Sequence, residues 1–167
     1  MKGRTMIVLN WQPVGVYRRP AGDVVEPWLL AWENMPQAAR YLRLTTTGRW
    51  TPMSGLPECG PDGLVGQTFQ ADRLIVSDCA VGALLGRVGG SSASLKGGAA
   101  PANQGDQSKN GAPAEKVEEN PSKPFAVGSH AVIKLPDDAI GPLFIGFNIL
   151  LRPVSVRTLE ITIQSSS

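Results

Sequence analysis

The sequence is poor in charge, cysteine, histidine and long apolar runs, and each shortage excludes a class of protein. Charged residues make up 18% of the 167 positions, which is too few for a coiled coil or a helical bundle. The apolar stretch at residues 142–151 is about half the ~20 residues that a membrane span requires. We therefore predict no transmembrane segment, while peripheral contact with a membrane stays open. Cys59 and Cys79 form neither a disulfide framework nor a zinc-binding pattern.

Signatures of catalysis and of nucleic-acid binding are also missing. His130 is the one histidine, and no nucleophile elbow, zinc-protease motif or phosphate-binding loop accompanies it. The net charge is only +2, although residues 1–50 carry a local basic excess. The apolar run at the N-terminus, about four residues long, is too short for a signal peptide. We expect no enzyme and no nucleic-acid partner, and a protein that is cytoplasmic or exported without a recognisable signal peptide.

What the sequence does contain is 19 glycines and 14 prolines, which separate short strand-like segments. Residues 156–163 show the clearest alternation, with Leu159, Ile161 and Ile163 on one face, although Val156 is out of phase. Residues 28–43 are the single helix candidate, and Pro36 interrupts it. The pattern predicts an all-β, antiparallel β-sandwich. Its further expected strands lie in residues 41–47, 83–88, 131–135 and 143–149.

Residues 89–124 are a low-complexity segment in which Gly, Ser, Ala, Pro, Asn and Lys dominate. Such a composition buries too little apolar surface to offset its ordering entropy. The segment is therefore predicted to be a long disordered insertion in a single domain. The predicted organisation is an N-terminal extension at residues 1–40, rich in tryptophan, followed by the sandwich at residues 41–167.

Three groups of residues resemble the LecA-type bacterial galactophilic lectins. The longest is residues 74–89, LIVSDCAVGALLGRVG. The others are Thr46–Trp50 with Cys59–Gly63, and Pro136–Gly141 with Leu143–Asn148. The resemblance covers roughly residues 41–90 and 125–165. It implies a sandwich of the jelly-roll or galactose-binding-like type and, in the family, a shared calcium and galactose site.

The calcium-binding part of that family site is not retained. Ile149 stands where the resemblance implies a calcium-binding aspartate, and the following residues contain no pair of asparagines. Calcium requires six to eight oxygen ligands, so we predict no cofactor and no metal ligand, although calcium itself stays possible. The candidate ligand-binding residues are Asn148, Asp72, Asp62 and Trp50. Strand context offers a core position as the alternative for Trp50.

The N-terminal region carries a second candidate site, made of Trp28 and Trp32 with Arg18 and Arg19 upstream. Tryptophan and arginine are enriched at protein interfaces, and the basic excess favours an acidic partner surface or lipid headgroups. The alternative is that this segment covers an edge or a face of the sandwich. The favoured function is a non-enzymatic binding or assembly module acting through protein–protein contacts as an accessory subunit of a larger assembly. The alternative is a galactoside-type carbohydrate-binding lectin with a non-standard site.

Overall fold

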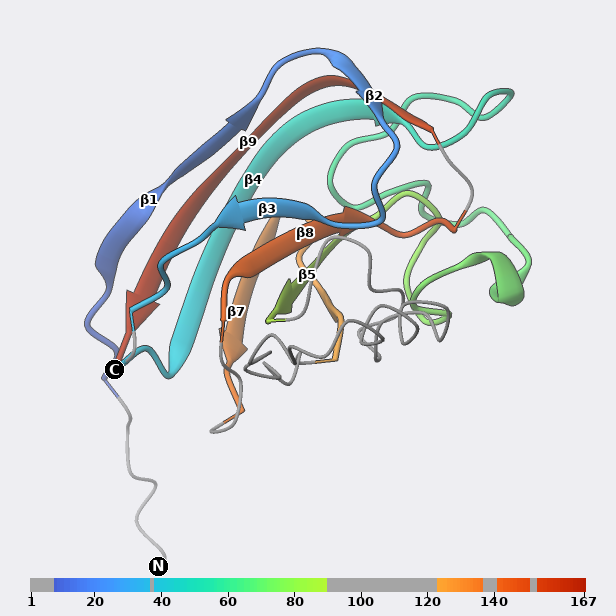
Figure 1. The fold of residues 1–167 in the computed structure, drawn as a ribbon. Coiled ribbons are helices and arrows are strands. Elements are labelled where there is room, and N and C mark those ends of the chain that lie inside the picture. Colours follow the sequence, from blue (N-terminus) through green and yellow to red (C-terminus); the bar gives the residue numbers. More distant parts are fainter. Residues whose placement is uncertain (1–7, 37, 90–122, 137–140, 151–152) are drawn as a thin grey trace, which may run out of the picture.

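The computed structural model describes residues 8–36, 38–89, 123–136, 141–150 and 153–167. In these residues the chain forms an all-β, sandwich-like fold of two antiparallel sheets (Figure 1). The predicted fold class is confirmed at this level. The elements are β1 (Gln12–Arg19), β2 (Gly22–Val24), β3 (Leu29–Trp32), β4 (Tyr41–Thr51), the 3-10 helix η1 (Ala71–Arg73), β5 (Leu84–Val88), β6 (Phe125–Ala126), β7 (His130–Lys134), β8 (Leu143–Phe147) and β9 (Val154–Ser166).

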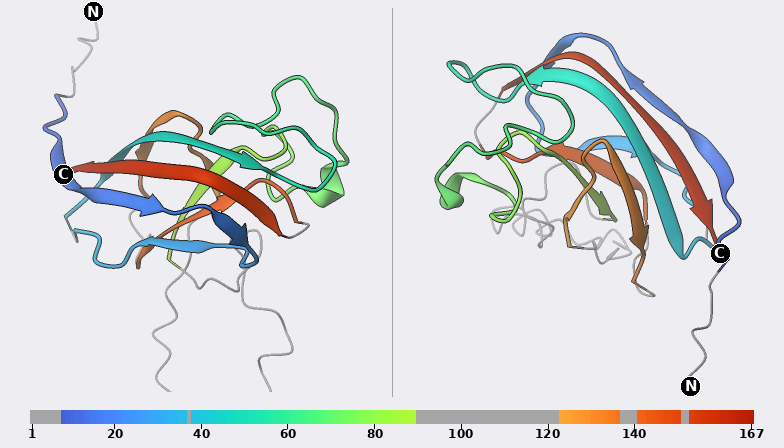
Figure 2. Two further views of the ribbon diagram at one scale, coloured as in Figure 1. Left: turned by 90° about the horizontal axis from the view of Figure 1, so that it is seen from above. Right: turned by 180° about the vertical axis from the view of Figure 1, so that it is seen from behind.

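The larger sheet, sheet A, is built around β9. Its order is β1-β9-β4-β7, and β2 also pairs with β9. Seen from above in Figure 2, β4, β9 and β1 run side by side. The 13 residues of β9 pair with β4 along 11 positions, so this ladder is the longest in the fold.

A bulge in β9 explains why Val156 is out of phase in the sequence. Thr158 pairs with Arg49, but the next position of β4, Trp50, pairs with Val156, which leaves Arg157 as an extra residue. Two residues opposite one is the definition of a bulge, and it shifts the inward-facing side chains by one position. Val156 and Leu159 are consequently both buried, on the two sides of the bulge.

The smaller sheet, sheet B, has the order β3-β8-β5-β6 and lies beneath sheet A. Every residue of β5 and β8 is buried, so both faces of these central strands are covered. A core between the sheets includes Leu84, Ile145 and Phe147. A second, smaller cluster on the other face of sheet B contains Trp28, Ile75, Leu85 and Phe144.

Strands β1, β2 and β3 lie within the predicted N-terminal extension, and they pair into both sheets. β1 and β2 pair with β9, whereas β3 pairs with β8. Residues 28–43, the helix candidate, form no helix in the described part of the segment: residues 29–32 are a strand and β4 begins at Tyr41. Leu29 and Ala31 are buried because they alternate inward, and burial against β8 outweighs the weak helical spacing. Most of the low-complexity segment, residues 90–122, lies outside the described residues.

Trp32 packs across the edge between the two sheets. Its indole lies against Gly15 of β1, at the place where a Cβ atom would stand on any other residue. Only glycine lets the Trp32 ring approach the β1 backbone this closely. The absence of a side chain at residue 15 thus allows β3 to pack against β1. The contact closes one side of the sandwich.

We therefore expect Gly15→Ala to destabilise the fold. The added methyl group would overlap the Trp32 ring, and overpacking of this kind costs about 1–3 kcal/mol in the free energy of unfolding. Urea denaturation measures the loss. The matched control is Gly60→Ala, whose Cβ would lie 3.7 Å from the nearest atom and should cost less than about 0.5 kcal/mol. Equal losses in the two variants would contradict the role given to Trp32.

Candidate functional site

Asn148, the strongest of the predicted ligand-binding residues, is fully buried. Its side-chain oxygen accepts a hydrogen bond from the backbone N–H of Val76 at 2.8 Å. Its amide nitrogen lies 2.9–3.1 Å from the carbonyl oxygens of Val76, Cys79 and Ala80. The amide thus satisfies the backbone of the turn at residues 76–80, which packs beside the end of β8. The side chain holds this loop and has no free face for a sugar.

Trp50 is also a core residue. Its indole N–H donates to the carbonyl oxygen of Gly82 at 2.7 Å, and its ring meets Phe147 edge to face at a centroid distance of 5.0 Å. No part of the side chain is exposed. The alternative of a core position, stated for Trp50 from its strand context, is therefore confirmed.

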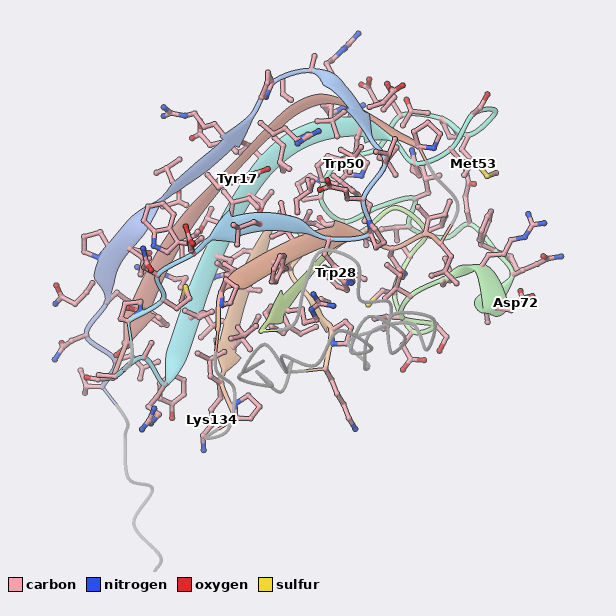
Figure 3. All side chains as sticks on the ribbon, viewed as in Figure 1. Tyr17, Trp28, Trp50, Met53, Asp72 and Lys134 are labelled. Carbon is pink, nitrogen blue, oxygen red and sulfur yellow. The ribbon has the colours of Figure 1, made fainter. Side chains whose placement is uncertain are left out.

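The two candidate aspartates, Asp62 and Asp72, are exposed and belong to different segments of the structure. Asp62 accepts hydrogen bonds from the backbone N–H and the hydroxyl of Ser129 at 3.0 and 3.4 Å, so it fastens its loop to the turn before β7. Asp72 lies in η1, on the outlying turn visible at the right of Figure 3. Asn148 and Trp50 lie close together, since both form hydrogen bonds with Gly82, but both are buried and offer no surface to a sugar. Ile149 beside Asn148 is also buried.

Trp28 lies on the face of sheet B that points away from sheet A, where no part of it is exposed. The guanidinium of Arg87 lies over its ring at 4.6 Å and over the ring of Phe144 at 5.1 Å. Arg87 Nε also donates to the carbonyl oxygen of Gly89 at 3.1 Å. Burial lowers the pKa of Arg87 to about 10, so the group still carries its charge at neutral pH. The cation–π contacts offset part of the cost of burying that charge.

The other predicted interface residues are not neighbours of Trp28. Trp32 is partly buried against Gly15, and Arg18 lies on the outside of sheet A, where it pairs with Glu160 at 2.7 Å. Arg19 is half-buried and donates weakly to the carbonyl oxygen of Asp23. Of the four residues, only Arg18 has an exposed side chain, and it lies on a broad surface.

That surface is the outer face of sheet A, the side turned away from sheet B. One row across it contains Val16, Thr162, Thr45 and His130, and the next contains Gln164, Arg43 and Val132. The sheet arches over sheet B, so this face is convex (Figure 1). Cations outnumber anions on it: the cations are Arg18, Arg43, Arg49, Lys134 and Arg157, and the anions are Asp23, Glu160 and, from the adjoining loop, Glu58.

Arg43 differs from the other arginines of this face in its contacts. Its Nε donates to the side-chain oxygen of Gln164 at 2.6 Å, and its guanidinium lies over the ring of Trp11 at 4.7 Å. Among the described residues the ion pairs of this face belong to Arg18, Arg49 and Arg157, and none belongs to Arg43. Arg43 is thus held in one place without being neutralised.

The two thiols are not activated for nucleophilic chemistry. Burial raises the pKa of Cys59 to about 11, and burial with the charge of Asp78 raises that of Cys79. Both cysteines are free and protonated at neutral pH, whereas a reactive thiol needs a lowered pKa. His130 is exposed and has Thr45 as its neighbour at 3.4 Å. The described ranges contain no group of three His, Cys, Asp or Glu side chains placed to hold a metal ion.

No protein-family profile matches this sequence, and a search of curated proteins returns no match. The resemblance to the LecA-type lectins therefore stays a prediction that rests on the motifs quoted above. Within the described part of the chain, no helix has both the length and the apolar character needed to cross a membrane.

Sequence reasoning missed Trp11, Gln164 and Arg43. Alternation in residues 41–47 was a usable signal for Arg43, because it places this residue on the opposite face from Leu42 and Leu44. No local signal links it to Trp11 or Gln164, since those contacts join three different parts of the chain.

The role of Asn148 predicts a large stability effect. In Asn148→Ala the N–H of Val76 and three carbonyl groups lose their partner, so we expect the free energy of unfolding to fall by about 2–4 kcal/mol. The loosened turn should also expose Cys79, which Ellman's reagent would then modify faster than in the wild type. A Cys79→Ser background identifies the reacting thiol. Unchanged stability and thiol reactivity would contradict the structural role.

Proposed function

We propose that this protein is a non-enzymatic binding or assembly module that docks an acidic protein surface on the outer face of sheet A. The observation that carries the proposal is the exposed, cation-rich face on which Arg43 is held in place without a carboxylate partner. Complementary charge steers association and fixes the orientation of a complex. In this role the protein is an accessory subunit.

The shape of the face favours a macromolecular partner over a small ligand. Small molecules bind in concave sites that enclose most of their surface, whereas the outer face of sheet A is convex (Figure 1). A protein can cover such a face and bury the exposed valines at its two sides, Val16 and Val132, which are 44% and 51% accessible. A standard interface of about 800 Å² per partner suits a sheet of this width.

Composition favours a protein over a polyanion. The face combines four arginines with Trp11 and Tyr41 but has a single lysine, Lys134. Arginine and aromatic residues dominate the energetics of protein interfaces, while lysine is depleted there. The overall charge of +2 is small for a protein that binds a nucleic acid or another dense polyanion.

We also propose a finer fold assignment, and we weigh one competing function against protein docking. A galactose-binding-like or jelly-roll sandwich is supported by the LecA-type motifs together with the two antiparallel sheets. The competing function is a galactoside-binding lectin. Against it stands the burial of Asn148 and Trp50 inside the fold, which leaves only Asp62 and Asp72 of the candidate sugar-binding residues on the surface.

A photo-crosslinking amino acid tests the location of the interface. We expect a probe at position Thr162, in the middle of the outer face of sheet A, to capture a partner that mass spectrometry identifies. The matched probe at Leu30, exposed on sheet B, should not capture this partner. Capture from Leu30 alone would overturn the proposal.

Charge reversal then tests the electrostatics with the purified partner. We expect Lys134→Glu with Arg157→Glu to weaken binding about tenfold or more, mainly through slower association, because both cations lie on the docking face. The control, Arg73→Glu with Lys123→Glu, makes the same change in net charge elsewhere on the molecule and should leave the affinity within about twofold. Equal losses of affinity in the two double variants would show that binding depends on total charge and not on the outer face of sheet A, which would contradict the proposal.

A glycan array with and without a chelator tests the lectin alternative. We expect no sugar binding in either condition, because Asn148 and Trp50 are buried and the carboxylate of Asp62 is bonded to Ser129. Saturable binding of a galactoside that Asp62→Asn or Asp72→Asn abolishes would overturn the protein-docking proposal in favour of the lectin.

A further inference from the structure

We propose that Arg43 is the anchor of the docking face and that it binds a carboxylate of the acidic partner in a two-point, fork-like geometry. This inference rests on the proposed function and deepens it, because it names the binding group and the chemistry of its ligand. The ligand is a carboxylate in a protein, either an Asp or Glu side chain or a free chain terminus.

The location of Arg43 follows from the register of sheet A. On β4 it lies opposite Gln164 of β9 on one side and opposite Val132 of β7 on the other. Leu42 and Leu44, its neighbours in the chain, are fully buried, so Arg43 projects outward. It therefore stands in the middle of the sheet and not at an edge.

Two contacts orient the guanidinium before any partner arrives. Trp11 stacks on its flat face, and Gln164 accepts from Nε, which is one of the five N–H donors of the group. The two terminal NH₂ groups carry no hydrogen bond or ion pair to any described residue. An arginine held in this way loses little side-chain entropy on binding. Such preorganisation increases affinity because less of the binding energy is spent on ordering the side chain.

Because residue 164 is a glutamine, the positive charge of Arg43 is not neutralised. A glutamine accepts the Nε–H bond without neutralising the guanidinium, whereas a glutamate in the same place would form an internal ion pair. Tyr41 and Val132 flank Arg43 as partly accessible apolar surface, and Lys134 adds a second cation on β7. A carboxylate with an apolar neighbour matches these surroundings.

Two substitutions test the anchor without removing bulk from the core. Gln164→Glu places a carboxylate on Arg43 from within, and Arg43→Lys keeps the charge but removes the fork-like geometry. Each should weaken binding of an amidated hexaglutamate peptide about tenfold or more, as measured by titration calorimetry. Ser155→Glu is the matched control: it adds the same charge to β9 about 30 Å from residue 164, well beyond the screening length, and should change the affinity less than about twofold.

A second peptide distinguishes the two sources of the carboxylate. Hexaglutamine with a free C-terminus presents only a terminal carboxylate, and its amidated form presents none. Binding of amidated hexaglutamate alone supports a side-chain ligand, and binding of free-terminus hexaglutamine that amidation abolishes supports a chain terminus. Failure of the wild type to bind any of these carboxylate peptides would overturn the anchor.

The remaining outcomes separate this inference from the proposed function. If the Gln164→Glu variant binds as tightly as the wild type, Arg43 is not the anchor. The same conclusion follows if Ser155→Glu loses as much affinity as Gln164→Glu. If the Lys134 and Arg157 charge reversals abolish binding of the purified partner while Arg43→Lys and Gln164→Glu leave it intact, the anchor is wrong and the docking face stands. Near-ultraviolet circular dichroism and urea midpoints equal to those of the wild type establish that each variant is folded.

Discussion

The antiparallel ladder between β4 and β9 is the interaction on which the rest of the structure depends. It aligns 11 positions of β4 with β9, and β9 in turn holds β1 and β2. Because side chains alternate along a strand, one ladder decides both what enters the core and what faces solvent. Leu42, Leu44, Ile161 and Ile163 fill the space between the sheets for this reason. The bulge at Arg157 keeps that division intact where the sequence changes phase.

The same register creates the candidate docking face. Arg43 and Gln164 are directly opposite each other, and this pairing turns two ordinary polar residues into a fixed guanidinium with an unneutralised charge. On the other side of the fold, the central strands of sheet B, β5 and β8, are covered on both faces, and the buried cation Arg87 lies over two aromatic rings. The two sheets therefore differ in exposure: the central strands of sheet B are covered on both faces, whereas the outer face of sheet A is open.

The residues that the lectin resemblance singled out illustrate how far sequence reasoning reached. The strands at residues 84–88 and 143–147 follow from the apolar runs that the motifs contain. The roles of the polar residues do not follow, because Asn148 and Trp50 bond to backbone groups of residues 76–82, far away in the sequence. A buried amide and an exposed sugar ligand look alike in a sequence. They differ only in which carbonyl groups the fold brings within hydrogen-bond distance.

The sequence by itself determined the all-β class, most of the strands and the inward side of β9, since these depend on alternation and on glycine and proline between short segments. The tertiary structure decided the rest. It paired residues 12–32 with both sheets, buried Trp28, set Trp32 on Gly15 and brought Trp11 and Gln164 to Arg43. The physical reason is that strand pairing and cation–π contacts join residues distant in the chain, and local pattern carries no information about which distant residue will be the partner.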